Sequence, residues 1–132
     1  MRTLRWLLVA PFAIAVWYVV LVAGVFVHSA LETRLCPPQE LVSGACGNPR
    51  VITILQIVVY VFVALSAVAV EVVAVATAPA HRDIIAWGTF AFGAAFAALL
   101  GAEGRQWGEA GAAIGAGLVT AICLHRVTRD AR

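Results

Sequence analysis

Charged residues are scarce in this chain. Asp, Glu, Lys and Arg together make up 12% of its 132 residues, whereas soluble domains carry about 25%. Lysine is absent altogether, because all nine basic residues are arginine, and the formal net charge is only +2. We therefore expect no nucleic-acid partner, since such a partner requires a strongly basic surface. With 63% apolar residues and a mean hydropathy of +0.97, the chain also falls outside the class of soluble domains.

Several patterns that mark enzymes and transporters are missing. The three cysteines, Cys36, Cys46 and Cys123, contain no Cys-x-x-Cys pair, on which four-helix membrane thiol oxidoreductases rely. None of the three histidines lies inside a long apolar run, which argues against a b-type haem held between membrane helices. The two halves of the chain do not correspond, as the halves of an inverted-repeat transporter would. We expect no cofactor, no metal ion and no catalytic residue.

Four apolar runs dominate the chain and predict an all-α membrane protein. The clearest run is Val51–Thr77, which has one charged residue, Glu71, in 27 positions. A helix needs about 20 apolar residues to cross the hydrocarbon core of a bilayer. The runs predict a four-helix antiparallel transmembrane bundle, a single domain over residues 1–132. Its helices are expected at about 6–27, 51–77, 84–100 and 109–124.

The first run, Trp6–Val27, has some features of a secretory signal peptide. Arg2 and Arg5 precede it, and a weak cleavage-like site lies at its end around His28. The run spans 22 residues, whereas the apolar region of a signal peptide has about 7–15. We therefore expect this segment to be retained as the first membrane helix.

Arginine placement predicts the orientation, because basic residues in short loops stay on the cytoplasmic side. With both termini inside, the outer segments hold only Arg34, Arg50 and Arg105. The inner segments then hold the other six arginines: Arg2, Arg5, Arg82, Arg126, Arg129 and Arg132. This bias predicts an N-in/C-in protein of a bacterial cytoplasmic (inner) membrane, with loop 29–50 outside.

The run at 109–124 is the weakest of the four. Many of its residues are glycine or alanine, which contribute little transfer free energy, and it is short for a bilayer span. We predict a membrane-inserted hairpin with the helix at 84–100. The alternative is a re-entrant or interfacial helix.

Cys36 and Cys46 lie in the expected outer loop. Cysteines on the oxidising side of a bacterial envelope tend to be bridged, and Pro37-Pro38 and Ser43-Gly44 supply turn residues between them. We predict a structural disulfide. The alternatives are thiol exchange with a partner and a metal site that adds His28 to the two thiolates.

Glu71 is the only ionisable residue well inside a predicted span. A carboxylate within a membrane is costly to bury and is a functional-site hypothesis by default. Its position, about 30 Å of helix after Val51, favours a structural ion pair near the inner interface with Arg5, Arg82 or Arg126. The alternative is a proton- or ion-coupling role.

Small residues recur at helical spacing in the second half of the chain. Close approach of helix backbones favours association in lipid. We expect the face of Gly93, Ala97 and Gly101 to pack on the face of Gly111 and Gly115, which form a GxxxG step. The alternative is contact with another copy or with another membrane protein.

These features favour a small non-enzymatic membrane protein that serves as an accessory, assembly or partner-binding subunit of a membrane complex. Its expected partners are the lipid bilayer and another membrane protein or further copies of itself. The second hypothesis is a small oligomeric transporter or channel with Glu71 near its inner mouth. The third is a membrane thiol oxidoreductase that uses Cys36 and Cys46.

Overall fold

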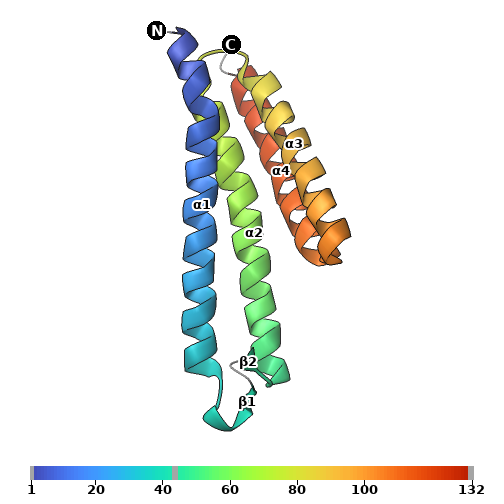
Figure 1. Cartoon of the computed structure of the whole chain (residues 1–132). Helices are drawn as coiled ribbons and strands as arrows, with labels where there is room; N and C mark the ends of the chain where they lie inside the picture. The colour runs from blue at the N-terminus through green and yellow to red at the C-terminus, as the bar shows by residue number, and fades with distance from the viewer. Residues whose placement is uncertain (1, 43–44, 131–132) are drawn as a thin grey trace.

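The structure, a computed structural model, describes residues 2–42 and 45–130, and for residues 2–5, 41, 42, 45 and 130 it describes the backbone alone. Four α-helices account for most of this part of the chain (Figure 1). Their bounds are α1 Arg2–Leu35, α2 Pro49–Thr77, α3 Arg82–Gly104 and α4 Trp107–Asp130. Between α1 and α2 lie the short 3-10 helix η1 Pro38–Glu40 and the two-residue strands β1 Leu41–Val42 and β2 Ala45–Cys46.

All four helices are long and apolar enough to cross a membrane. The segments that meet this condition are Trp6–Leu35, Pro49–Thr77, Arg82–Gly104 and Trp107–Arg129. Most of their large apolar side chains are exposed, which is costly in water and acceptable in lipid. The prediction of four membrane helices is confirmed, and the chain has the character of a multi-pass membrane protein.

Each of the four helices extends further than the sequence predicts, and α1 and α4 exceed their predicted lengths the most. The first was expected to end at Val27 with an outer loop over 29–50, but α1 continues to Leu35, so the loop begins only at Cys36. The helix expected at 109–124 is one unbroken helix of 24 residues, long enough to cross a bilayer.

The helix ends follow from local sequence. Asn48 caps α2, because its side-chain oxygen accepts from the backbone N–H groups of Arg50 and Val51 at 3.0 and 3.5 Å, and Pro49 occupies the first helical position. Two left-handed residues mark the remaining turns: His81, with φ 53°, precedes α3, and Arg105, with φ 55°, follows it.

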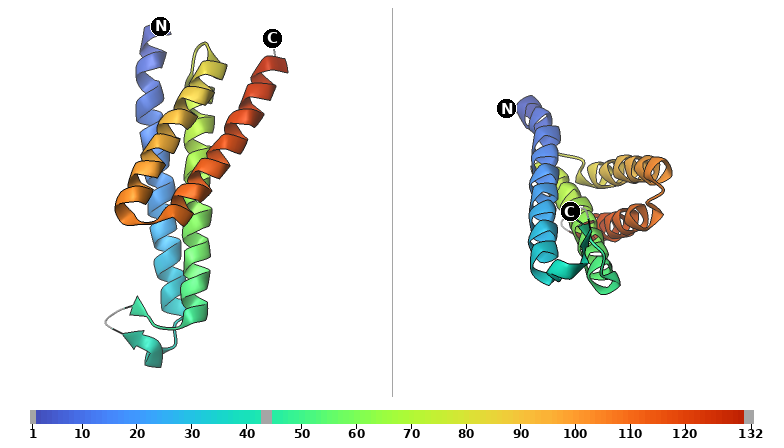
Figure 2. Two further views of the ribbon diagram at one scale, coloured as in Figure 1. Left: turned by 90° about the vertical axis from the view of Figure 1, so that its right-hand side faces the viewer. Right: turned by 60° about the horizontal axis from the view of Figure 1, so that its bottom comes forward.

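The α2 helix occupies the centre of the arrangement. It contacts α1 on one side and both α3 and α4 on the other, while α3 and α4 pack on each other (Figure 2). The start of α1, the end of α4 and the α2–α3 turn lie at one end of the molecule, here called the α2–α3 end (Figure 1). The loop between α1 and α2 lies at the other end, here called the disulfide end.

The α1–α2 pair is longer than the α3–α4 pair and projects beyond it at the disulfide end (Figure 1). The start of α4 contacts α2 well inside that helix, since Gln56 Nε2 donates a hydrogen bond to Glu109 Oε1 at 3.2 Å. The seven helical steps from Pro49 to Gln56 correspond to about 10 Å of helix. A short helical hairpin with its loop therefore stands clear of α3 and α4.

Candidate functional site

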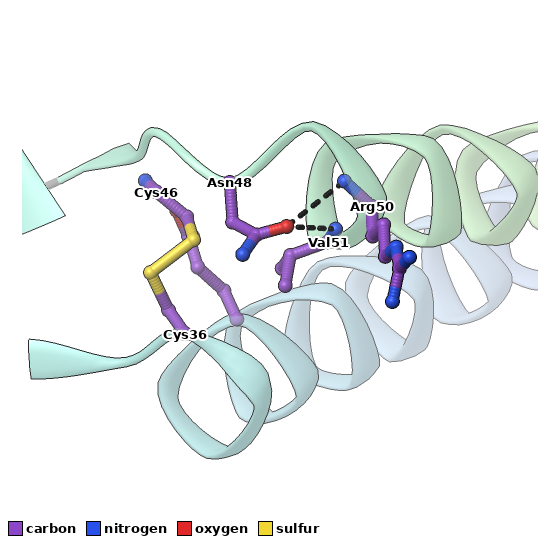
Figure 3. Close-up of a disulfide and its surroundings, with 6 residues drawn as sticks. Cys36, Cys46, Asn48, Arg50 and Val51 are labelled. Carbon is purple, nitrogen blue, oxygen red and sulfur yellow. Dashed lines mark hydrogen bonds between the residues drawn. A yellow bond between two sulfur atoms is a disulfide. The ribbon is translucent and has the colours of Figure 1, made fainter. Parts of the chain in front are cut away.

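The projecting end of the α1–α2 pair is closed by a disulfide. Cys36 and Cys46 are bonded, with their Cα atoms 5.8 Å apart, which is within the usual range. This pairing confirms the predicted intramolecular bridge, and Figure 3 shows it beside the cap of α2. We call residues 31–42 and 45–55 the disulfide tip.

The disulfide tip has a small core of its own. The two cysteines are buried together with Val51 and Leu55, and Leu31 packs against this cluster. Polar contacts complete it, because Glu32 Oε1 accepts from the Cys46 backbone N–H at 3.2 Å and Glu40 O accepts from the Gly47 N–H at 2.8 Å. The disulfide, the cluster and the two hydrogen bonds give the tip a defined shape outside the packed helices.

The second notable feature is Glu71, which lies on the face of α2 toward α4. Its side chain is 3% exposed, and no hydrogen-bond partner for Oε2 occurs among the described residues. A Cβ atom added to Gly117 of α4 would lie 2.9 Å from Glu71 Oε1 and 3.3 Å from the ring of Phe90. Glu71 is therefore enclosed where α2 meets α3 and α4, and its carboxyl group lies against Gly117, which has no side chain.

Among the side chains that the structure describes, no arginine is paired with Glu71. Arg82 and Arg126 are both exposed, and Arg82 Nε donates to the Ala78 carbonyl oxygen at 3.5 Å. The predicted ion pair of Glu71 with Arg82 or Arg126 is not formed in the part of the chain that the structure describes, and the side chain of Arg5 lies outside it. The physical reason is the orientation of the side chains. The Glu71 side chain points toward α4, whereas the side chains of Arg82 and Arg126 are exposed.

The predicted helix-packing residues divide into two groups. Gly101 is buried, and a Cβ atom there would lie 2.9 Å from Ala110 Cβ, so this glycine lets α3 and α4 approach closely. Ala97 is partly buried. Gly93, Gly111 and Gly115 have open space where a Cβ atom would stand, so they do not pack α3 on α4 as predicted.

Sequence reasoning missed the residues that join α2 to α4. These are Gln56 with Glu109, Tyr60, which lies against Gly108, and Gly117, which lies against Glu71. A signal for the first pair exists, since Gln56 is a polar residue inside an apolar run and Glu109 begins the last one. Gly108 and Gly117 carry no such signal, because the second half of the chain has many glycines and nothing in the sequence distinguishes these two.

The remaining candidate groups are not assembled into a site. Cys123 is a free, exposed cysteine, and the part of the chain that the structure describes holds no group of three metal-ligating side chains.

Comparisons with protein families, with curated proteins and with solved structures find no match for this chain. The candidate sites are thus the disulfide tip and Glu71.

Proposed function

We propose that this protein is a non-enzymatic accessory subunit that binds another membrane protein through its disulfide tip. The observation that carries the proposal is the projection of the tip beyond α3 and α4, with its own core and its covalent closure. A binding surface of fixed shape loses little conformational entropy when a partner docks.

The proposed topology places both termini inside and the disulfide tip outside. Contacts between α1 and α2 support a hairpin with neighbouring helices antiparallel, since Leu31 lies near Leu55 and Gly24 lies against Phe62. The six inner and three outer arginines of the sequence follow the positive-inside rule in this orientation. An outer location in a bacterial inner membrane also suits a disulfide, because that side is oxidising.

A structural role for the disulfide is favoured over thiol exchange. Cys36 and Cys46 are only 8% and 7% exposed, and their surroundings are the apolar side chains of the tip cluster. Exchange requires a thiolate to reach one of the sulfur atoms. Burial of both cysteines hinders that approach, so the proposal gives the bridge no catalytic part.

The proposal is tested by purifying the tagged chain from its native membrane in a mild detergent and identifying what co-purifies. We expect one membrane protein in a fixed ratio to the chain. As the matched control, Arg105→Gln alters an exposed residue of the α3–α4 turn, away from the tip, and should retain the same partner. Recovery of the chain alone, or of copies of itself alone, would contradict the accessory role.

A second candidate function is a small oligomeric transporter or channel. It is favoured by the buried Oε2 atom of Glu71, which has no hydrogen-bond partner among the described residues. Several copies would be needed, because Glu71 is the only carboxyl group well within the predicted spans and a relay requires more than one group. The enclosure of Glu71 against Gly117 and Phe90 fits a buried structural position better than the mouth of a water-filled path.

Replacement of Glu71 separates the two functions. We expect Glu71→Met to fold with equal or greater stability, because it removes a buried carboxyl group that has no described partner. Thermal unfolding in detergent measures this effect, and Glu71→Gln serves as the variant of matched shape. Proteoliposomes with an internal pH dye then report proton flux. Flux in the wild type that disappears in both variants would establish the transporter instead.

A further inference from the structure

A groove of about 350 Å³ opens at the α2–α3 end, between the first part of α1 and the last turn of α2. Leu8 and Phe12 line it from α1, and both are exposed, at 40% and 49% of their surfaces. The opposite wall consists of Ala76, Thr77, Ala78, Pro79 and Arg82. Its volume is within the range of about 300–1,000 Å³ that is common for ligand sites.

The groove changes from apolar to cationic along its length. Phe12 and Ala76 lie inside the apolar segments of α1 and α2, whereas Arg82 is the first residue of the α3 segment, just after the α2–α3 turn. The hydrogen bond from Arg82 Nε to the Ala78 carbonyl oxygen, at 3.5 Å, holds the guanidinium group beside the groove. Among the described lining residues Arg82 carries the only charge.

We propose that this groove binds one anionic phospholipid of the leaflet at the α2–α3 end. An acyl chain would lie along Leu8, Phe12 and Ala76, and the phosphate group would meet the guanidinium of Arg82. Arginine pairs readily with phosphate oxygens, and basic pockets between membrane helices recognise anionic lipid head groups. Along the groove, apolar side chains are followed by the guanidinium group of Arg82. In a phospholipid, the acyl chains are followed in the same way by the phosphate group.

Charge complementarity selects an anionic lipid over a zwitterionic one. Arg126 and Arg129 in the last part of α4 add positive charge at the same end of the molecule, and Asp83, which lies near Arg129, offsets only part of it. A zwitterionic head group carries a positively charged ammonium group, which the arginines at this end repel. A phosphatidylglycerol head group carries no such positive charge. The bound lipid would also fill the open side between α1 and the end of α2.

Native mass spectrometry of the purified full chain tests the proposal, with phosphatidylglycerol or phosphatidylcholine added in detergent. We expect preferential retention of phosphatidylglycerol in the wild type. Arg82→Gln should weaken that retention about fivefold, the effect of removing one arginine contact near a membrane surface. Arg105→Gln, which changes an exposed arginine at the far end of α3, should leave retention unchanged.

A second variant tests the apolar part of the groove. Ala76 is exposed and lines the groove, so Ala76→Leu should fill it and reduce lipid retention without disturbing the helix contacts. Circular dichroism checks that both variants stay helical. Equal retention of the two lipids by the wild type would overturn the proposal, as would unchanged phosphatidylglycerol retention in folded Arg82→Gln and Ala76→Leu.

Discussion

Replacing Gly101 with leucine is expected to separate α3 from α4 and to lower the free energy of unfolding by about 1–3 kcal/mol or more. Even a single added Cβ atom would lie 2.9 Å from Ala110 Cβ, which is closer than such atoms approach in proteins. Ala110 is itself buried at this contact, and its Cβ atom is fixed to the backbone of α4. The strain is therefore relieved only by moving one helix away from the other.

Gly93→Leu is the matched control for this variant. It makes the same change on the same helix, but a Cβ atom at Gly93 meets nothing within 4 Å. Because leucine is a better helix former than glycine by roughly 1 kcal/mol, we expect Gly93→Leu to be neutral or stabilising. Unfolding of both variants in mixed micelles of mild detergent and dodecyl sulfate measures the difference. Equal losses of stability would show that the close contact of α3 and α4 is not at Gly101.

Removal of the disulfide is expected to loosen the tip and leave the membrane helices in place. In the chain-entropy treatment, closing a ring of about 11 residues stabilises the folded form by roughly 2.5–3 kcal/mol. The cluster of Leu31, Val51 and Leu55 is small, so it offsets only part of this loss. The double variant Cys36→Ser/Cys46→Ser should therefore open at the tip, while the packed segments of α2, α3 and α4 remain helical.

Hydrogen exchange resolved by peptide measures this opening directly. We expect faster exchange over residues 36–55 in the double variant and no change over α3 and α4. Cys123→Ser, which replaces the free exposed cysteine, is the control and should exchange like the wild type. A tip that exchanges slowly in the double variant would mean that the apolar cluster and the Glu32 hydrogen bond suffice without the bridge.

Much of the fold was predictable from the sequence because hydropathy reports directly on transfer into a bilayer. The four apolar runs indicated four membrane helices, and the turn residues between Cys36 and Cys46 indicated a disulfide. The end of α1 was placed too early, at Val27, because the residues that follow are polar. Polar residues end a membrane span but not a helix, and here the helix continues to Leu35 against the start of α2.

The candidate sites were less predictable, because a sequence pattern does not show which neighbour a helix face meets. Gly101 and Gly111 carry the same local signal for close packing, yet only Gly101 lies against another helix of this chain. The sequence offers Arg5, Arg82 and Arg126 as partners for Glu71, but the rotation of α2 turns the Glu71 side chain toward Gly117. The rotation of each helix about its axis and the choice of its neighbours depend on contacts among all the helices. The composition of a helix and the spacing of its residues do not specify these contacts.

Site-specific photocrosslinking from the disulfide tip in the native membrane tests whether the tip is the surface that binds another membrane protein. Gln39 lies in η1 and is exposed, so a photoreactive residue there samples whatever contacts the tip. Arg105 in the α3–α4 turn, also exposed, is the matched control position. We predict a single adduct from position 39, joined to one other membrane protein, and none from position 105. No adduct from position 39, or an adduct with another copy of this chain alone, would show that the tip does not bind a partner membrane protein.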